Sequence, residues 1–281
     1  MVQLLFHPRT ARQLEQLQVK LPQSLIIEGE SGSGVVTTAQ YLADQLRAET
    51  FIIKPKKLKN SQPVIDELEG SIIIQDIRQL YEHTRGKSTK RQVIILDTGE
   101  RSITHGAQNA FLKLLEEPRA GVHFIIATHR PSELLPTVRS RSQTLHIASL
   151  LVSQVEQLLD TLGVNDDTMR TRLQFIGRGL PALITRLTGD DERYDERVKI
   201  VVDAKQLLGA TDSGTFATIH TYRDKRSEAT LLLDDMCQQL RIILRKQPDA
   251  RHAAKIERCL TARERILGGG NIRLQLALAV L

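Results

Sequence analysis

Short runs of apolar residues, several of them β-branched, constrain the fold of this chain more than any other feature of its sequence. Four such runs lie in the first half of the 281 residues, separated by stretches whose apolar positions have helical spacing: 25–28, 72–74, 93–96 and 124–127. Runs that are apolar throughout predict strands buried on both faces, which is the pattern of a parallel sheet covered by helices. The first part of the chain is therefore predicted to be an α/β domain with a parallel sheet.

The second half of the chain carries helical patterns only. After about residue 148 the strand signals stop, and apolar residues recur at helical spacing in a series of segments: 153–162, 168–176, 180–187, 198–208, 216–222, 229–244, 253–266 and 272–281. The stretch Gly189-Asp190-Asp191 marks a boundary inside this helical part. We therefore predict three domains: an α/β domain over 1–148, a small helical domain over 149–189 and a larger helical domain over 190–281.

Composition and the small number of cysteines limit the functions open to the chain. Hydrophobic residues make up 41% and charged residues 26% of the sequence, as in soluble globular proteins. No apolar run approaches the roughly 18 residues that a membrane span needs, and residues 1–16 lack the pattern of a secretory signal. Two cysteines, Cys237 and Cys259, cannot form a four-ligand zinc site. We expect a cytoplasmic protein with no membrane contact and no metal site of its own.

A glycine-rich turn follows the first apolar run and precedes a predicted helix, which is the setting of a phosphate-binding loop. A working loop has the pattern G-x-x-x-x-G-K-[ST], in which backbone N–H groups surround a phosphate, the lysine neutralises it and the hydroxyl binds Mg²⁺. Here Gly29 and Gly34 are present, but Val35 and Val36 stand at the lysine and hydroxyl positions. We expect the turn to serve packing; binding of a nucleotide or phosphate by its backbone alone is the alternative.

The apolar run at 93–96 ends in an acidic residue, as in the second motif of this class of ATPase. Asp97 fits the position of the acid that faces the metal ion, whereas Thr98 stands where a glutamate would polarise the attacking water. The chain thus lacks the lysine, the hydroxyl and the general base, in two separate motifs. This pattern predicts a phosphate-loop fold that does not hydrolyse ATP by itself.

Three segments downstream of Asp97 resemble one family closely. They read QNAFLKLLEE at 108–117, ATHRP at 127–131 and LLPTVRSRS at 134–142, and they resemble the bacterial DNA polymerase III clamp loader, a family of AAA+ ATPases. The resemblance is strong over 72–147 and weaker over the rest of the chain. It implies an AAA+ P-loop domain with a parallel sheet, followed by a small helical lid domain and an all-α C-terminal collar domain for oligomerisation.

Within this family the degenerate loop is similar to that of the delta-prime branch, whose members act as a rigid end-piece of the loader. The chain departs from the family in two places. Residues 51–61 lack the four-cysteine zinc module that many members carry, and Ser142 replaces the cysteine of a Ser-Arg-Cys motif.

The resemblance also implies roles for individual residues. Arg141 matches the arginine that reaches across a subunit boundary to the γ-phosphate of the neighbour's ATP; the other interpretation is a surface arginine paired with a local carboxylate. Thr128 matches the first sensor of the γ-phosphate, but without the lysine nearby we expect its hydroxyl to bond the backbone. Leu180 stands where the arginine of the second sensor would fall.

The implied function is that of a non-motor clamp-loader subunit, which supports ATP-driven loading of a sliding clamp onto primed DNA and supplies Arg141 in trans as an arginine finger. The implied partners are motor subunits of the gamma/tau type, a delta-type subunit, the sliding clamp and, through the complex, primer–template DNA. ATP and Mg²⁺ are expected on partner subunits, with no cofactor on this chain and no independent ATPase activity.

Two other functions are weighed against this one. A divergent phosphate-loop ATPase or other nucleotide-binding enzyme would bind Mg-ATP as an isolated chain, which Val35 and Val36 argue against. An ATP-independent DNA-binding scaffold would bind DNA tightly and with steep salt dependence in the absence of partners. The net charge of +6 is spread along the chain and aromatic residues make up only 4%, which argues against a basic stripe with a stacking platform.

Overall fold

The computed structural model describes residues 4–59, 62–66, 70–84, 91–99, 103–117, 119–209 and 213–280. The chain divides into two compact units, 1–186 and 187–281, and each is described by itself. None of the described helices is both long enough and apolar enough to cross a lipid bilayer.

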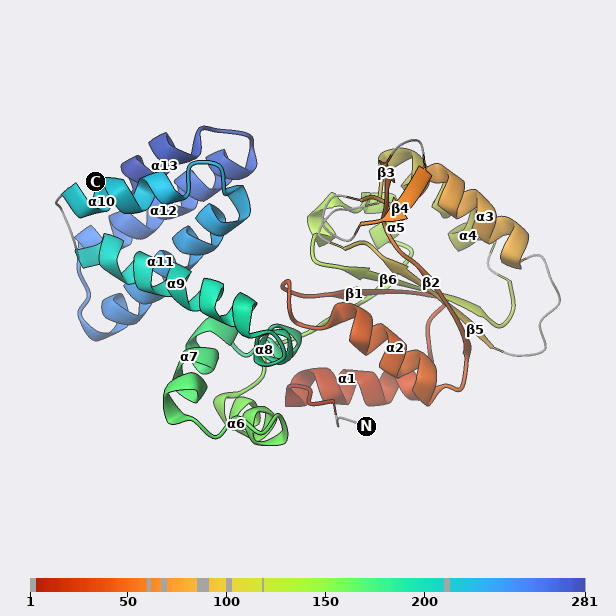
Figure 1. Ribbon diagram of the computed structural model, residues 1–281. Helices are drawn as coiled ribbons and strands as arrows, with labels where there is room; N and C mark the ends of the chain where they lie inside the picture. The colour runs from red at the N-terminus through yellow and green to blue at the C-terminus, as the bar shows by residue number, and fades with distance from the viewer. Residues whose placement is uncertain are drawn as a thin grey trace. The chain divides into compact units, whose positions relative to one another are not determined.

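A five-stranded sheet forms the centre of the first unit (Figure 1). Its strands, in their order across the sheet, are β2 (Glu49–Ile53), β5 (Gln92–Asp97), β6 (Val122–Thr128), β1 (Ser24–Glu28) and β7 (Gln143–His146). Every neighbouring pair runs parallel, so the predicted parallel sheet is confirmed. Because the strands are parallel, all their carboxyl ends meet at one edge of the sheet, the carboxyl edge, and all their amino ends at the other, the amino edge.

Alternate residues of the strands point into two separate apolar cores, one on each face of the sheet. On one face, Leu25 and Ile27 pack with helices α1 (Pro8–Val19) and α2 (Val35–Gln45). On the other face, Ile26 packs with α3 (Ile74–Thr84), α4 (His105–Glu116) and α5 (Pro136–Arg139). Figure 1 shows α1 and α2 on one side of the sheet and α3 and α4 on the other. Burial on both faces explains why the central residues of β1, β5 and β6 are apolar, whereas the edge strand β7 is largely polar and exposed.

The expected strand at 72–74 is wrong. Ile72 makes only an isolated bridge to Ile103, and Ile74 is already the first residue of α3. Ile72 is nevertheless fully buried in the core that α3 and α4 cover, which explains why this segment has the composition of a strand. The sheet instead includes β2 and β7, which the four apolar runs do not contain. A short antiparallel hairpin of β3 (Lys56–Lys59) and β4 (Gln62–Ile65) stands apart from the sheet.

Every helical segment predicted after residue 148 corresponds to a helix, and no strand follows β7 in the part of the chain that the structure describes. The helices are α6 (Val152–Thr161), α7 (Asp167–Gly177), α8 (Pro181–Thr188), α9 (Asp191–Gly209), α10 (Ser213–Thr221), α11 (Arg226–Lys246), α12 (Ala250–Leu267) and α13 (Ile272–Val280). The largest difference is at α9, which begins at Asp191 rather than near residue 198. The domain boundaries predicted at 148 and 189 stay predictions.

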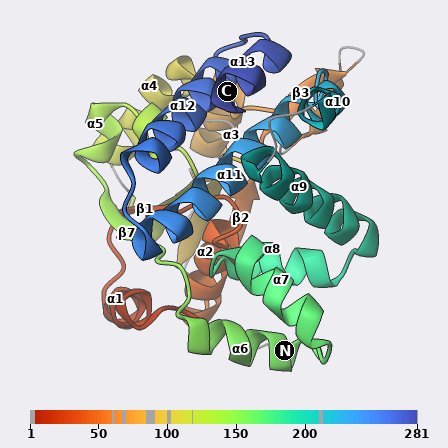
Figure 2. The ribbon, with the colours of Figure 1, turned by 90° about the vertical axis from the view of Figure 1, so that its left-hand side faces the viewer.

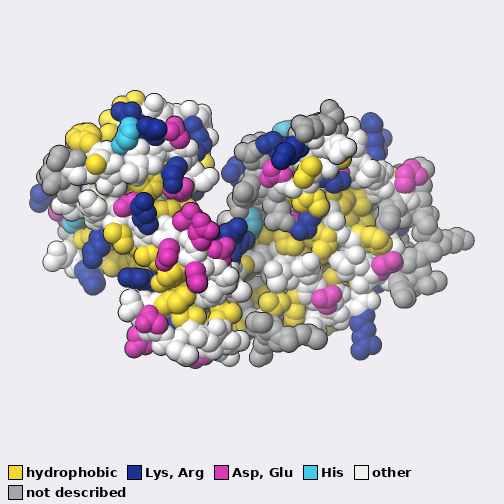
Figure 3. Space-filling model, in the orientation of Figure 1, with side chains coloured by type: hydrophobic (Ala, Val, Ile, Leu, Met, Phe, Trp, Pro, Cys, Tyr) yellow, Lys and Arg dark blue, Asp and Glu magenta, His cyan; other side chains and the backbone are white. Residues whose placement is uncertain are grey.

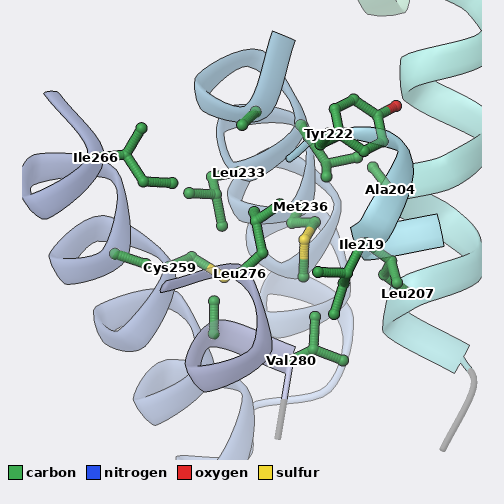
Figure 4. Close-up of a cluster of buried hydrophobic side chains, with 14 of the residues drawn as sticks. Ala204, Leu207, Ile219, Tyr222, Leu233, Met236, Cys259, Ile266, Leu276 and Val280 are labelled. Atoms are coloured by element: carbon green, nitrogen blue, oxygen red, sulfur yellow. The ribbon is translucent and has the colours of Figure 1, made fainter. Parts of the chain in front are cut away.

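Helices α9 to α13 of the second unit enclose one aliphatic core (Figure 4). Leu233 and Met236 of α11, Cys259 of α12 and Leu276 of α13 converge in it, and all four side chains are fully buried. Figures 1 and 2 show α12 beside both α11 and α13. No described residue of this unit is a tryptophan or phenylalanine in the core, so packing relies on branched aliphatic side chains.

A buried ion pair joins two of these helices. Arg197 of α9 and Asp235 of α11 form two parallel hydrogen bonds, Nη1 to Oδ2 at 2.5 Å and Nη2 to Oδ1 at 2.7 Å, and both side chains are buried. The two hydrogen bonds compensate the free energy that both ions lose when they leave water. Removal of either ion would therefore leave the other buried without compensation.

We predict that Asp235→Asn lowers the free energy of unfolding of the second unit by about 3–5 kcal/mol, because the Arg197 charge stays buried without its counterion. Urea unfolding followed by circular dichroism measures this. Asp224→Asn is the matched control, because the Arg223–Asp224 pair is exposed and is worth at most about 1 kcal/mol. Equal losses for the two variants would contradict the assigned role of the buried pair.

Candidate functional site

The glycine-rich turn lies at the carboxyl edge of the sheet, between β1 and α2. In the register of the sheet, Glu28 is opposite Thr128 and Asp97 is opposite Ala127, so the predicted elements of an ATP site meet at this edge. The Gly29 N–H donates directly to the Thr128 carbonyl at 3.4 Å. The structure thus brings together the turn, Asp97 and Thr128, as expected for a phosphate-loop fold.

The residue at the lysine position of the loop faces the apolar core. Val35 is the first residue of α2, is only 2% exposed and packs in the core with Leu25 and Ile27 of β1. Val36, at the hydroxyl position, packs against the same core. Gly34, which precedes them, has φ of +85° and serves as the N-cap of α2. The two valines therefore contribute to packing of the first unit and offer neither positive charge nor a metal ligand.

The middle of the turn is held by the small helix α8. The Gly32 carbonyl accepts hydrogen bonds from the backbone N–H groups of Ala182 at 3.0 Å and Leu183 at 3.1 Å. These N–H groups belong to the first turn of α8, where backbone donors have no partner inside the helix. A Cβ on Gly32 would lie 2.7 Å from Leu183 Cβ, so the turn and the helix are in close contact. The first-turn donors of α8, which would suit an anion, are thus occupied by the loop itself.

The polar side chains at this edge are bonded to the backbone beside them. Asp97 Oδ1 accepts from the Gly99 N–H at 3.0 Å. Thr128 is fully buried, and its hydroxyl oxygen accepts from the Arg130 N–H at 3.0 Å. Thr98 is also fully buried, and Leu180, at the second-sensor position, is buried in apolar surroundings. None of these four side chains is an exposed polar group that faces the glycine-rich turn.

Taken together, the residues at this edge do not fit a magnesium nucleotide. The position of the phosphate-binding lysine is an apolar core residue, and the Gly32 carbonyl takes the donors of α8. Over the described ranges no group of three or more His, Cys, Asp or Glu side chains could hold a metal ion.

Arg141 lies in the turn between α5 and β7 and is partly exposed to solvent. Its Nη2 is 2.9 Å from Glu116 Oε1 at the end of α4, and its Nη1 donates to the Thr137 carbonyl at 3.2 Å. The Arg141 side chain is 40% exposed and that of Glu116 is 50% exposed. An ion pair in such exposed surroundings contributes at most about 1 kcal/mol, so it breaks at little cost.

Two hydroxyl groups fix the backbone next to Arg141. The Ser142 hydroxyl is 2.8 Å from the hydroxyl of Ser24, the first residue of β1, and it donates to the Val138 carbonyl of α5 at 2.9 Å. The turn that carries Arg141 is therefore anchored to the amino edge of the sheet. Ser142, which stands in place of the family's cysteine, supplies this anchor through its hydroxyl.

Arg141 and the glycine-rich turn consequently lie at opposite edges of the same sheet. Ser24 begins β1 at the amino edge, and Glu28 ends it at the carboxyl edge next to Gly29. Five residues of strand separate the two edges by about 13 Å between the first and last Cα atoms. Arg141 is therefore remote from the loop of its own unit, and its guanidinium contacts Glu116 and the Thr137 carbonyl.

Sequence reasoning missed three of these contacts. The bond between Gly32 and α8 joins residues far apart in the chain and has no local signal. Ser24 is likewise unmarked as a partner of Ser142. The sequence analysis allowed for Arg141 to pair with a local carboxylate, but it did not identify Glu116 as that carboxylate.

The sequence of this chain is similar to those of several known proteins. The family model described as DNA polymerase III, delta subunit, matches residues 7–151, which is more than half of the chain. A DNA polymerase III subunit delta' from Pseudomonas aeruginosa is 28% identical over 179 residues, which cover 62% of this chain and 51% of that protein. The Bacillus subtilis subunit delta' is 29% identical over 196 residues, covering 65% and 58%. The chain thus spans about half the length of the curated relatives it matches.

Solved structures support the fold. A gamma subunit-related protein of DNA polymerase III from Thermotoga maritima superposes with a TM-score of 0.59 at 20% identity and covers 95% of this chain and 97% of its own. A mutant of the Holliday junction branch migration motor RuvB from the same organism gives a TM-score of 0.51 at 15% identity, covering 97% and 88%. At these identities the similarity concerns the fold alone.

We predict that Gly32→Ala lowers the free energy of unfolding by about 2–4 kcal/mol. About 1–2 kcal/mol comes from a side chain at a φ of +91°, and the rest from the new Cβ pressing on Leu183. Gly34→Ala is the matched control, because its φ is +85° but its Cβ would have normal contacts at 3.8 Å. Thermal unfolding of both variants isolates the contact with α8, and equal losses would show that α8 does not press on Gly32.

Proposed function

Because the chain belongs to the DNA polymerase III delta-prime family of clamp-loader subunits, we propose that it is a non-motor subunit of an AAA+ loader that places a sliding clamp on primed DNA. In this proposal the chain supplies Arg141 in trans to the ATP site of a neighbouring subunit. One observation carries the proposal: Arg141 is exposed at the amino edge of the sheet, on the opposite side from the loop of its own unit.

The contacts of Arg141 suit a residue that changes partner on assembly. Its exposed ion pair with Glu116 costs about 1 kcal/mol or less to break, whereas an arginine that meets the developing charge of a γ-phosphate accelerates phosphoryl transfer by about 10³–10⁵. The anchor through Ser142 and Ser24 keeps the backbone of the turn in place while the side chain moves. The backbone of Arg141 is thus held in place, and its guanidinium is held only by an exposed ion pair and a backbone hydrogen bond that it can exchange for a partner on another subunit.

The carboxyl edge supports the other half of the proposal, that ATP and Mg²⁺ bind to partner subunits and that the chain itself has no ATPase activity. Val35 is part of the core, and the Gly32 carbonyl occupies the first turn of α8. The hydrogen bonds between the Gly32 carbonyl and α8 hold the turn against this helix.

The proposed partners are motor subunits of the gamma/tau type and a delta-type subunit, with the sliding clamp and primer–template DNA engaged through the complex. A DNA polymerase III subunit tau from Salmonella typhimurium is 26% identical to this chain over 153 residues, which supports the choice of gamma/tau-type subunits as partners. On the face drawn in Figure 3, basic and acidic side chains are interspersed.

We predict that Arg141→Ala leaves assembly with the partner subunits intact but lowers ATP turnover at the one site it serves by about 10³-fold or more. Steady-state DNA-stimulated ATPase of the reconstituted complex measures the share of turnover lost with that site. Arg139→Ala is the matched control, because Arg139 is exposed on the same turn and no family role is assigned to it. Unchanged turnover in the Arg141→Ala complex would remove the trans role.

We also predict that Val35→Lys does not produce ATPase activity in the isolated chain and that it lowers the free energy of unfolding. The new ammonium group would enter an apolar core without a partner, and Thr98 would still stand in place of the general base. Phosphate release and thermal unfolding are the two measurements. Hydrolysis by this single variant would show that the second motif has been misinterpreted.

A further inference from the structure

A groove on the second unit is not used by the proposed function. It has a volume of about 840 Å³ and runs along one face of α12, with walls from the ends of α9, α11 and α13. Its floor is apolar, formed by Leu208, Leu240, Ile243 and Leu278. Ile243 and Leu278 are exposed there, at 38% and 47%. Large apolar side chains exposed in a groove are typical of binding surfaces.

The rim of the groove is strongly basic. Arg251, Lys255, Arg258 and Arg265 follow one another along a single face of α12 at intervals of three, four or seven residues, and Glu257 is the one acidic residue that lines the groove. Lys255, Arg258 and Arg265 have no acidic partner within salt-bridge distance among the described residues. Burial lowers the pKa of the Lys255 ammonium, as expected for a cation that is partly desolvated and unpaired.

A buried polar group also faces the groove without a partner. Gln275 of α13 lines it and is 7% exposed, and among the residues that the structure describes its Oε1 has no hydrogen-bond partner. A buried acceptor of this kind costs free energy until a donor reaches it. A molecule that fills the groove must therefore bring an N–H or O–H group for Gln275. It must also bring negative charge for the basic rim and an apolar surface for the floor.

We propose that the groove binds an amphipathic helix of a partner protein, with acidic side chains on its flanks and aliphatic side chains on the face that enters. From Arg251 to Arg265, α12 spans about 21 Å, which matches a helix of about four turns. Carboxylates of the guest pair with the basic rim, aliphatic side chains cover Ile243 and Leu278, and an N–H donor reaches Gln275. A nucleic-acid backbone would pair with the rim but would leave the apolar floor uncovered, since phosphates supply no apolar surface.

Fluorescence anisotropy with the full chain tests this proposal. The probe is a fluorescein-labelled helical peptide of about 16 residues with leucines on one face and glutamates on both flanks. The comparison probes are the same peptide with lysines in place of the glutamates, and a single-stranded oligonucleotide of equal charge. We expect the acidic peptide to bind and the lysine peptide not to bind. Absence of binding by the acidic peptide, or equal binding by both peptides, overturns the proposal.

Charge variants locate the binding. Arg258→Glu should lower the affinity for the acidic peptide by at least about fivefold. Arg273→Glu, an equal charge change on α13 outside the groove, should lower this affinity by less than about twofold. Equal effects of the two variants would show that only net charge is sensed. Binding of the oligonucleotide that competes with the peptide and is lost in Arg258→Glu would reassign the groove to nucleic acid.

Gln275→Leu separates binding from folding. Because this variant removes a buried acceptor without a partner, we expect its melting temperature to be unchanged or higher. We expect its affinity for the acidic peptide to fall by a fewfold. A lower melting temperature together with unchanged peptide affinity would show that Gln275 has a structural role instead. None of these measurements depends on Arg141, so failure of the groove proposal and failure of the arginine finger remain distinguishable.

Discussion

The parallel direction of the five strands is the constraint on which the arrangement of functional groups depends. It collects the glycine-rich turn, Asp97 and Thr128 at one edge of the sheet and the Arg141 turn at the other. A residue at the amino edge lies about 13 Å from the loop of its own unit, across the length of β1. The separation between the glycine-rich turn and the Arg141 turn is therefore a consequence of strand direction.

The glycine-rich turn keeps its shape because it is built into the packing of the first unit. Val35 completes the core between β1 and α2, and the carbonyl of Gly32 satisfies backbone donors of α8. The turn is thus held from both sides, by the apolar core beneath Val35 and by the first turn of α8.

The second unit shows a different distribution of polar groups. Its interior holds one bidentate ion pair, Arg197 with Asp235, which ties α9 to α11 inside an otherwise aliphatic core. On its surface, by contrast, three cations of α12, Lys255, Arg258 and Arg265, have no acidic partner among the described residues and lie beside exposed aliphatic side chains. The buried charges are compensated by each other, whereas these three exposed charges are not.

The sequence by itself determined the class of the fold and the run of helices after residue 148, because apolar periodicity is a local property of the chain. It misassigned 72–74, since a loop buried beside two helices is as apolar as a strand, and it missed β2, whose pairing partner β5 is about forty residues away. Only the tertiary structure decided that Gly32 bonds α8, that Arg141 pairs with Glu116 and that the basic face of α12 borders an apolar groove. These contacts join residues distant in the chain, and they depend on the direction and packing of whole elements rather than on any local pattern.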